Sequence, residues 1–398
     1  MQTVVEIDLG DPDNFVPGVP HHMFDWLREN APVYRHERPG QPPFWCLTRW
    51  AEVEEASREW RRYSSAHGTN IDDPVGGAEL MMLNMDPPAH TKLRNLVRKA
   101  FTPRMVSALQ PHIRDIAEQL VDRIAHMGEC DFVTEISAEL PLQVICELLG
   151  VPLEDRHMMF HWSNQMIGFE DPEYATNIDT ATTAAMSMYQ FAGMLGQQRR
   201  FEPKQDLVTA LIEAEVDGEK LNEIEFSVFF LLLAVAGNET TRNLISGGLT
   251  ALLEHPSERD RLTAERALMP TAVDEMLRWV TPVMHFRRTA MEDFDLRGEH
   301  IRAGDKVILW YISANRDEEM FPGPHRFDAG RTPNEHLAFG GGGPHFCLGM
   351  NLARLEIEVM FDVLLDRLPD IELAGPPSRM RSNFINGTKH LPVRFGAR

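Results

Sequence analysis

The 398-residue sequence predicts a mainly α-helical fold with a small β portion. Helical periodicity continues from about residue 89 to residue 275, whereas strand-like runs are confined to the first 85 residues and to the part after residue 278. No stretch of flexible composition separates these regions. We therefore expect a single domain over residues 1–398, with the strand-bearing regions as its smaller β-rich part.

The composition is that of a folded protein with a strongly acidic charge balance. The chain has 43% hydrophobic and 25% charged residues, and 39 Lys and Arg against 60 Asp and Glu give a formal net charge of -21. This balance argues against general affinity for nucleic acids or anionic membranes, although a local basic patch remains compatible with an acidic partner. The four cysteines show no C-x-x-C pair, which indicates neither a disulfide framework nor a zinc module.

The sequence does not predict membrane attachment. Its start, MQTVVEIDLGDPDNF, lacks a basic segment followed by an apolar one, as a signal peptide or anchor would have. The longest apolar run, residues 226–237, is shorter than the ~20 residues that span a bilayer, so it predicts a buried helix. With cysteines that suit a reducing compartment, we expect a cytoplasmic protein without a membrane anchor.

Local patterns predict the individual elements along the chain. Before residue 85, the runs at 31–36 and 43–49 predict strands, and residues 51–63 predict a helix. The helices of the middle region are expected to stop near residues 128–130, 149–152 and 201–206. Residues 222–254 predict one long helix through the interior, because its centre is almost wholly apolar. Later, the sequence predicts strands at 285–290 and 306–314, a Pro- and Gly-rich meander at 317–333 and a helix at 348–368.

A glycine-rich segment, AFGGGGPHFCLGMNLARLE at residues 338–356, leads through Cys347 into the last predicted helix. Backbone N–H groups at a helix start favour a thiolate and hydrogen bond its sulfur, so Cys347 is a candidate soft metal ligand. From the cysteine alone, a small buried hydrophobic residue is the more common alternative. The glycines match neither the P-loop nor the dinucleotide-binding fingerprint.

The segment AGNETT, residues 236–241, places an acid and two hydroxyls in the apolar centre of the long helix. Such groups are costly to bury without partners or a task. Thr240 can donate to the carbonyl of Ala236, and Gly237 removes side-chain bulk, so we expect a local opening for a small molecule and water. Glu239 would then carry protons. A satisfied polar patch where helices cross is the alternative from this segment alone.

Two further motifs pair side chains on one helix face. Glu275 and Arg278 lie three residues apart, and His90 and Arg94 lie four apart. The second pair offers two cationic donors side by side, which suits a carboxylate or a phosphate. Taken separately, both motifs are more typical of solvated helix surfaces.

Together and in this order, these four motifs resemble those of the cytochrome P450 family, the haem-thiolate monooxygenases, over nearly the whole chain. The resemblance implies the P450 fold, with a long central helix over a haem and a cysteine-ligand loop before a proximal helix. It implies Cys347 as the thiolate ligand of the iron, with His345 and Gly349 as the matching residues of that loop. Phe339 departs from the pattern, because it lies one residue farther from Cys347 than in the commonest spacing.

The resemblance also implies the roles of other residues. Thr240 and Glu239 match the catalytic, proton-steering pair. A structural triad is implied for Glu275, Arg278 and Arg326. No C-x-x-C-H motif is present, so we expect a noncovalent haem b. The implied cofactor-binding residues are His90, Arg94, Ala236, Arg288, His345, Cys347 and Gly349.

The details of these motifs are most similar to those of P450 groups that hydroxylate sterols, methyl-branched lipids and terpenoids. An apolar pocket lining favours an apolar substrate, although each lining residue is singly as compatible with ordinary core. Alternatives are a biosynthetic P450 that acts on a macrolide or other secondary metabolite, and a peroxide-driven haem-thiolate hydroxylase. The lining residues implied are Met81, Met82, Leu83, Leu232, Val235, Ala236, Met284, Phe286, Phe384 and Ile385.

Electrons must come from separate redox proteins, because the chain has no flavin or nicotinamide fingerprint and no cysteine cluster for iron and sulfur. The resemblance implies a small acidic ferredoxin with its reductase, and a monomeric enzyme that inserts one atom of O2 into a C–H bond. A haem sensor or carrier would not need the acid and threonine of AGNETT. The candidate docking face for the ferredoxin consists of Lys92, Arg98, Lys99, Arg104 and Arg354.

Overall fold

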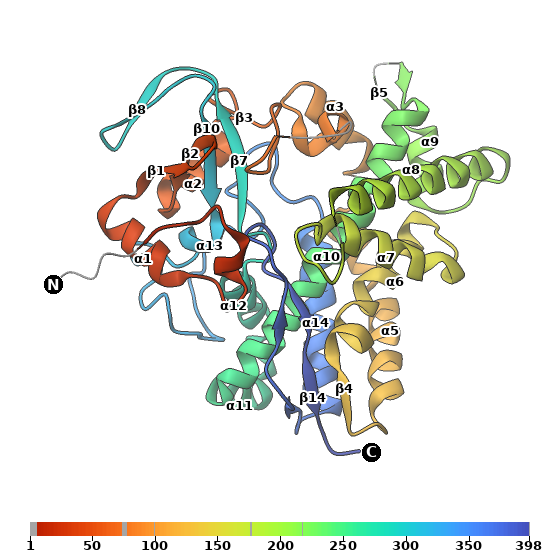
Figure 1. Cartoon of the computed structure of the whole chain (residues 1–398). Coiled ribbons are helices and arrows are strands. Elements are labelled where there is room, and N and C mark those ends of the chain that lie inside the picture. Colours follow the sequence, from red (N-terminus) through yellow and green to blue (C-terminus); the bar gives the residue numbers. More distant parts are fainter. Residues whose placement is uncertain (1–5, 74–77, 99, 176, 217, 398) are drawn as a thin grey trace.

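The computed structural model describes residues 6–73, 78–98, 100–175, 177–216 and 218–397. An α-rich part lies beside a smaller β-rich part, with the long helix α10 between them (Figure 1). The prediction of a mainly α fold with a small β portion is therefore confirmed. The larger helices are α1 His21–Asn30, α2 Trp50–Arg58, α3 Ala89–Val97, α5 Gln110–Ile124, α6 Glu139–Leu149, α7 Arg156–Ile167, α8 Ile178–Phe201, α10 Glu223–Glu254, α11 Pro256–Ala264, α12 Met269–Val280 and α14 Met350–Arg367.

Shorter helical segments connect these elements. They are η1 Pro12–Phe15, η2 Ala78–Leu80, η3 Met82–Asn84, α4 Pro103–Ser107, η4 Val133–Ser137, η5 Leu153–Asp155, α9 Leu207–Glu213, η6 Arg266–Leu268 and α13 Tyr311–Ala314.

The main sheet has five strands in the order β1-β2-β10-β7-β3. β10 pairs in parallel with β2, with Val307 opposite Trp45, so the first part of the chain and the part after residue 278 share one sheet. Only the first half of the predicted strand 306–314 is extended, because the chain turns into α13 after Trp310. The strands of this sheet are β1 Val33–Arg38, β2 Gln41–Leu47, β3 Tyr63–Ser64, β7 His285–Ala290 and β10 Lys306–Trp310.

Small two- and three-stranded sheets complete the β structure. One of them joins β14 to β4, which fixes the C-terminal part of the chain beside the end of α5. The strands are β4 Glu129–Asp131, β5 Glu215–Val216, β6 Glu219–Lys220, β8 Phe294–Leu296, β9 Glu299–Ile301, β11 Glu372–Leu373, β12 Ser378–Arg379, β13 Thr388–His390 and β14 Pro392–Arg394.

The helix stops lie where the sequence predicts them. α6 ends at Gly150, whose φ of 77° is the left-handed conformation that glycine adopts without strain. α8 ends at Phe201, and the side chain of Asp206 caps the start of α9 by accepting the N–H of Thr209 at 2.8 Å. The break near residue 129 is the strand β4.

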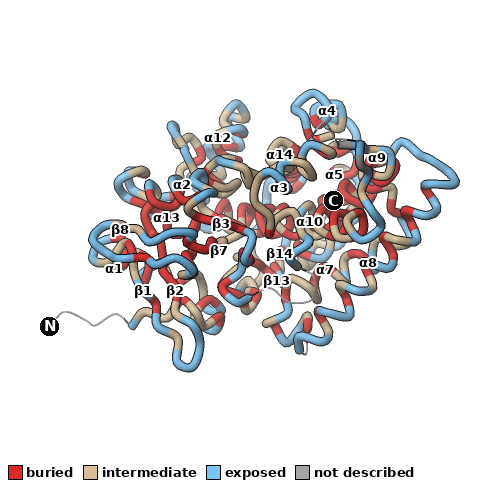
Figure 2. Tube along the Cα trace, turned by 90° about the horizontal axis from the view of Figure 1, so that it is seen from above, coloured by how far each residue is buried: buried red, intermediate tan, exposed pale blue. Residues whose placement is uncertain are grey.

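The helix α10 spans almost the whole predicted range 222–254. Asn222 and Glu225 form a capping box at its start, which satisfies backbone N–H groups that have no partner within the helix. α10 is long and apolar enough to cross a bilayer by length and composition, but it packs in the interior of the fold. Figure 2 shows buried residues along α10, whereas α8 at the edge alternates between buried and exposed residues.

The expected local opening of α10 at Gly237 is wrong, because the helix is continuous from Glu223 to Glu254. A Cβ atom at residue 237 would lie 3.0 Å from the side chain of Ile145 on α6. Gly237 therefore permits close packing of α6 against α10 and leaves the helix intact.

Candidate active site

The cysteine loop folds back on itself before α14. The backbone N–H of Cys347 donates to the carbonyl of Phe339 at 2.9 Å, and Gly349 precedes the first residue of α14. Gly343 has a φ of 72°, and a Cβ atom there would collide with the carbonyl oxygen of Ser57 on α2. The glycines therefore let the loop turn tightly against α2 and present Cys347 at the start of a helix. The backbone of Phe339 thus lies beside Cys347, and the guanidinium carbon of Arg354 is 5.0 Å from the centroid of the Phe339 ring.

The sulfur of Cys347 lies among groups that act on it in opposite directions. Burial raises the pKa of the thiol, while hydrogen bonds from the backbone of Gly349 and Met350 and the charge of Arg94 lower it. Burial prevails, so the pKa is raised overall. A thiolate at this position therefore needs a further positive charge, which a bound metal cation supplies.

Two histidines and two arginines gather beside the loop. The rings of His90 and His345 are 4.3 Å apart between centroids, and Arg94 donates to the carbonyl of Phe346 at 2.6 Å. Arg288, on β7, is buried and donates to the neighbouring backbone carbonyl of Arg287 at 2.8 Å. Among the described residues, neither Arg94 nor Arg288 forms an ion pair with a carboxylate.

Both histidines also have a buried ring nitrogen without a hydrogen-bond partner in the described part of the chain, Nδ1 of His90 and Nε2 of His345. Burial lowers the pKa of His90 to about 4. Burial and the charge of Arg288 lower the pKa of His345 to about 2. Buried nitrogens without partners are costly unless a ligand completes them, and an anionic ligand would in addition favour the protonated, donating form of each ring.

The donor set fits a haem. The two carboxylates of a haem can bind to the two arginines and two histidines, and the iron of a haem can bind to a cysteine sulfur. Nothing lies within 4 Å of the position that a Cβ atom of Gly349 would take, so a flat group can approach the backbone there. On α10, Ala236 is exposed although it lies in the middle of an interior helix, which shows accessible space on that side.

Thr240 and Glu239 lie on different faces of α10. The hydroxyl of Thr240 donates to the carbonyl of Ala236 at 2.9 Å, as the sequence predicts. Glu239 is buried and forms an ion pair with Arg242, one turn farther along α10. Burial raises the pKa of Glu239, and Arg242 opposes this shift. Arg242 was missed by the motif reading, although its spacing from Glu239 indicates such a pair.

The predicted structural triad is correct for two of its members. Arg278 binds Glu275 through two hydrogen bonds of 2.8 Å, and both side chains are fully buried. The third member is Arg331, which donates to Glu275 at 3.0 Å and is 9% exposed.

The prediction of Arg326 as the third member is therefore wrong. Its side chain is 70% exposed and pairs with Asp328 at 3.5 Å. Only the backbone of Arg326 takes part, because its carbonyl accepts from Arg278 and Arg331. The two arginines lie five residues apart in an irregular segment, so spacing alone does not distinguish them.

Comparisons with known proteins agree with this geometry. The cytochrome P450 family model matches residues 183–369. The steroid C26-monooxygenase of Rhodococcus jostii is 43% identical over 98% of this chain and 84% of that protein. The methyl-branched lipid omega-hydroxylase of Mycobacterium tuberculosis is also 43% identical, over 98% of this chain and 95% of that protein.

The chain belongs to the cytochrome P450 family. Among solved structures, Mycobacterium marinum cytochrome P450 CYP268A2 in complex with pseudoionone superimposes with a TM-score of 0.92 at 40% identity, over 99% of this chain and 100% of that one. The protein is thus a cytochrome P450 monooxygenase with the P450 fold, and the family implies a haem-thiolate cofactor.

Several residues of the expected pocket lining border accessible space in this P450. Leu232 and Val235 are partly exposed next to Ala236. Phe286 and Phe384 are also partly exposed, and their ring centroids are 5.6 Å apart. The remaining partly exposed residues of the predicted set lie at or beside η3 and are Met81, Met82 and Leu83.

The prediction of Met284 as a lining residue is wrong. Its side chain is fully buried in a cluster with Phe15 and Trp310, so it borders no accessible space. Ile385 is only 3% exposed and pairs through its backbone with Val283, which is partly exposed. Successive side chains of an extended chain point to opposite sides, so Val283 and Met284 differ in exposure.

The candidate docking face lies on α3, α4 and α14, and α4 packs against α14. Arg98 and Arg104 are exposed, and Lys92 is partly exposed. Arg354 binds Asp274 through hydrogen bonds of 3.0 and 2.8 Å, which offsets its charge. Lys99 lies outside the described residues.

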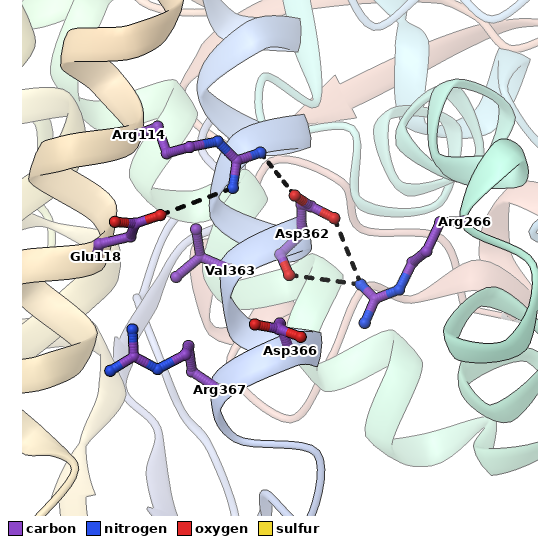
Figure 3. A pocket seen from close by; sticks show the side chains of 7 residues that line it. All are labelled: Arg114, Glu118, Arg266, Asp362, Val363, Asp366 and Arg367. Atoms are coloured by element: carbon purple, nitrogen blue, oxygen red, sulfur yellow. Dashed lines mark hydrogen bonds and ion pairs between the residues drawn. The ribbon is translucent and has the colours of Figure 1, made fainter.

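A surface pocket of about 240 Å³ lies between α5 and the C-terminal half of α14, far from Cys347 at the start of that helix (Figure 3). Asp362 there follows the start of α14 by 12 residues, which corresponds to about 18 Å along the helix. Its charged groups bind one another, because Arg114 and Arg266 both reach Asp362. This pocket therefore does not contribute to the site at Cys347.

Proposed function

We propose that this cytochrome P450 hydroxylates an apolar lipid, such as a sterol, a methyl-branched lipid or a terpenoid. The observation that carries this proposal is the accessible apolar face of α10 at Leu232, Val235 and Ala236, next to Thr240. Relatives at 43% identity that are named for steroids and for methyl-branched lipids support it. The reaction consumes substrate, O2, two electrons and two protons, and releases the alcohol and water.

We propose a noncovalent haem b with the Cys347 thiolate as ligand of the iron. When bound, the haem supplies the binding and cleavage of O2 and the transfer of one oxygen atom to carbon. His90, Arg94, Arg288 and His345 would hold its two carboxylates, which supply a partner for the unpaired ring nitrogens and an anion for the two arginines, neither of which the described residues provide. Gly349 leaves room for the flat ring system.

The protein's own chemistry is then positioning and proton supply. The apolar face of α10 holds the substrate and excludes bulk water. Thr240 holds a proton-donating hydroxyl beside Ala236, and Glu239 supplies protons to this region from a buried position. Each of the two protons consumed per turnover reaches the site through these groups, which are then reprotonated from solvent, and both protons end in the products.

We further propose a cytoplasmic, monomeric enzyme that takes electrons from a small acidic ferredoxin and its reductase. Two exposed arginines support the candidate docking face: Arg98 directly follows α3, and Arg104 lies on α4. Arg94 on α3 donates to the carbonyl of Phe346, so this face adjoins the cysteine loop. Electron transfer should slow as salt concentration rises, since exposed charges are screened. Salt-insensitive electron transfer would argue against this docking face.

The decisive experiment is a spectral titration of the purified ferric protein with sterols, branched fatty acids, terpenoids and macrolides. A shift from low to high spin with one lipid class supports the proposal, because the substrate displaces water from the iron. A shift with macrolides alone would favour a biosynthetic role on secondary metabolites instead. The reduced carbon monoxide complex of wild type and Cys347→Ser tests the ligand, and only the wild type should show the thiolate band.

The Thr240→Ala variant tests the proton supply. We expect it to consume electrons at a rate similar to that of the wild type while forming less product. Unchanged product per electron would contradict the role of Thr240. Turnover with hydrogen peroxide alone, at the rate supported by O2 and a ferredoxin, would favour a peroxide-driven hydroxylase.

A further inference from the structure

Glu239 is joined to a second helix through a network that the family motif does not include. Its partner Arg242 is fully buried on α10 and donates to the side-chain oxygen of Asn164 on α7. The guanidinium also lies over the ring of Phe160, again on α7, with 5.6 Å between its carbon and the ring centroid. Two residues of α7 therefore fix the cation that binds Glu239.

The geometry places Glu239 apart from Thr240. Residues three positions apart on a helix share a face, whereas neighbouring side chains point about 100° apart. The ion pair with Arg242 therefore holds the carboxylate of Glu239 on the side of α7, while Thr240 bonds back to Ala236. Within the described residues, the carboxylate of Glu239 thus pairs with Arg242, and no hydrogen bond joins it to Thr240.

The charges around Glu239 are few. Arg242 faces it from its own helix, and Asn164 contributes an uncharged acceptor from α7. Tyr174, on the loop after α7, is influenced by the charges of Arg242 and Glu239, and burial raises its pKa to about 12, so it stays neutral. Asn238 donates weakly to Glu239 at 3.4 Å. In the described residues, Arg242 is thus the one cation that offsets the burial of this carboxylate.

We propose that Arg242 and Asn164 are positioning residues through which α7 controls the proton donor Glu239. Asn164 accepts from Nη1 of Arg242 and Glu239 pairs with Nη2, so both draw on the charge of one guanidinium. A stronger acceptor at residue 164 therefore releases the carboxylate toward its protonated, mobile form, and a missing acceptor leaves Arg242 to Glu239 alone. This inference deepens the proposed monooxygenase function and rests on it.

The test compares Asn164→Asp, Asn164→Leu, Arg242→Gln and Arg242→Lys in the haem-loaded protein. The first readout is the infrared carboxyl band of Glu239 as a function of pH, identified by its loss in Glu239→Gln. We expect Asn164→Asp and Arg242→Gln to raise the titration midpoint by about one pH unit, a tenfold change in the protonation constant. Asn164→Leu should lower it or leave it unchanged, and Arg242→Lys should restore it toward the wild-type midpoint.

The second readout is product formed per electron consumed, with the lipid found by the titration above. Asn164→Asp and Asn164→Leu should shift this ratio in opposite directions relative to the wild type. The solvent isotope effect on turnover should likewise shift in opposite directions in the two variants, while the affinity for substrate changes little. Arg199→Gln is the matched control, because it breaks another buried Arg pair, which joins α8 to Asp206 at the start of α9. It should lower stability and leave both readouts unchanged.

Equal midpoints in wild type, Asn164→Asp and Arg242→Gln would overturn the inference. So would equal losses of coupling in these variants and in Arg199→Gln, because they would indicate general destabilisation. If Asn164→Asp does not fold, the comparison of Arg242→Gln with Arg242→Lys decides. The infrared titration needs neither substrate nor redox partner, so a failure to hydroxylate any lipid would reject the proposed function without deciding this inference.

Discussion

Two buried charged clusters of this protein differ in how completely the protein satisfies them. Around Glu275, the carboxylate accepts from Arg278, Arg331, Asn334 and the backbone of Asp328, at 2.8 to 3.2 Å. Around Cys347, by contrast, His90 and His345 keep ring nitrogens without partners in the described residues, and Arg288 reaches only a backbone carbonyl.

The difference separates a structural cluster from a binding cluster. Buried polar groups normally have partners, so a saturated network stabilises the fold and offers nothing to a ligand. Two arginines without a carboxylate partner and two histidines with unpaired ring nitrogens, counted within the described residues, are costly in the protein alone, and binding of an anionic ligand offsets that cost. Substitutions in the first cluster should therefore change folding, and those in the second should change cofactor affinity.

The largest effect is expected from Glu275→Leu. It leaves Arg278 and Arg331 buried without their anion, which costs about 3–5 kcal/mol of unfolding free energy. Urea unfolding measures this loss. The control Glu372→Leu removes an exposed pair with Arg394, and a far smaller loss is expected there because solvent screens the two charges. Equal losses in both variants would contradict the comparison.

A smaller loss should distinguish Arg331 from Arg326. Arg331→Leu removes a charged hydrogen bond to Glu275, which costs about 1.5–3 kcal/mol. Arg326→Leu changes an exposed side chain and should stay within about 0.5 kcal/mol of the wild type. If thermal unfolding ranked the two variants the other way round, the assignment of Arg331 would be wrong.

In the second cluster, Arg288→Gln should weaken haem binding about 10- to 100-fold, since it removes a charge-assisted hydrogen bond worth about 1.5–3 kcal/mol. Haem transfer to an acceptor protein measures this change, and unfolding of the haem-free chain should be nearly unaffected. The adjacent Arg287 is the control, because it binds Asp73 at 2.7 Å within the protein. Arg287→Gln should reduce stability more than haem affinity.

The smallest effect concerns His390, which binds Asp131 at 2.6 Å and Glu173 at 2.8 Å. The hydrogen bond to Asp131 raises the pKa of His390. Its contribution to stability is therefore complete below the ordinary histidine pKa of about 6.5 and is lost as pH rises through the raised value. Because the side chains are partly exposed, we expect about 0.5 kcal/mol or less.

Urea unfolding across this pH range checks the His390 prediction. His390→Gln should remove the pH-dependent part of the stability, whereas His300→Gln, at an exposed histidine beside Asp295, should retain it. A wild-type stability that increases through the same pH range, and loses this increase in His390→Gln, would show that the sign is wrong.

Regular and local features could be predicted from the sequence with good accuracy. Periodicity indicates the range of α10 and the strands at residues 33–38 and 285–290. The hydrogen bond from Thr240 to Ala236 depends only on residues one helical turn apart. Arg331 could not be found in this way. Its bond to Glu275 depends on how an irregular segment is turned relative to the distant helix α12.

The sequence by itself determined the helices, the strands and the positions of Cys347, Thr240 and Glu275, because each follows from a short-range pattern of side chains. Only the tertiary structure decided that Met284 packs in the core, that Arg326 faces solvent and that Arg242 is held by Asn164 of α7. These outcomes depend on contacts between elements distant in sequence. Packing and the desolvation of buried charges decide such contacts, and both depend on the whole fold.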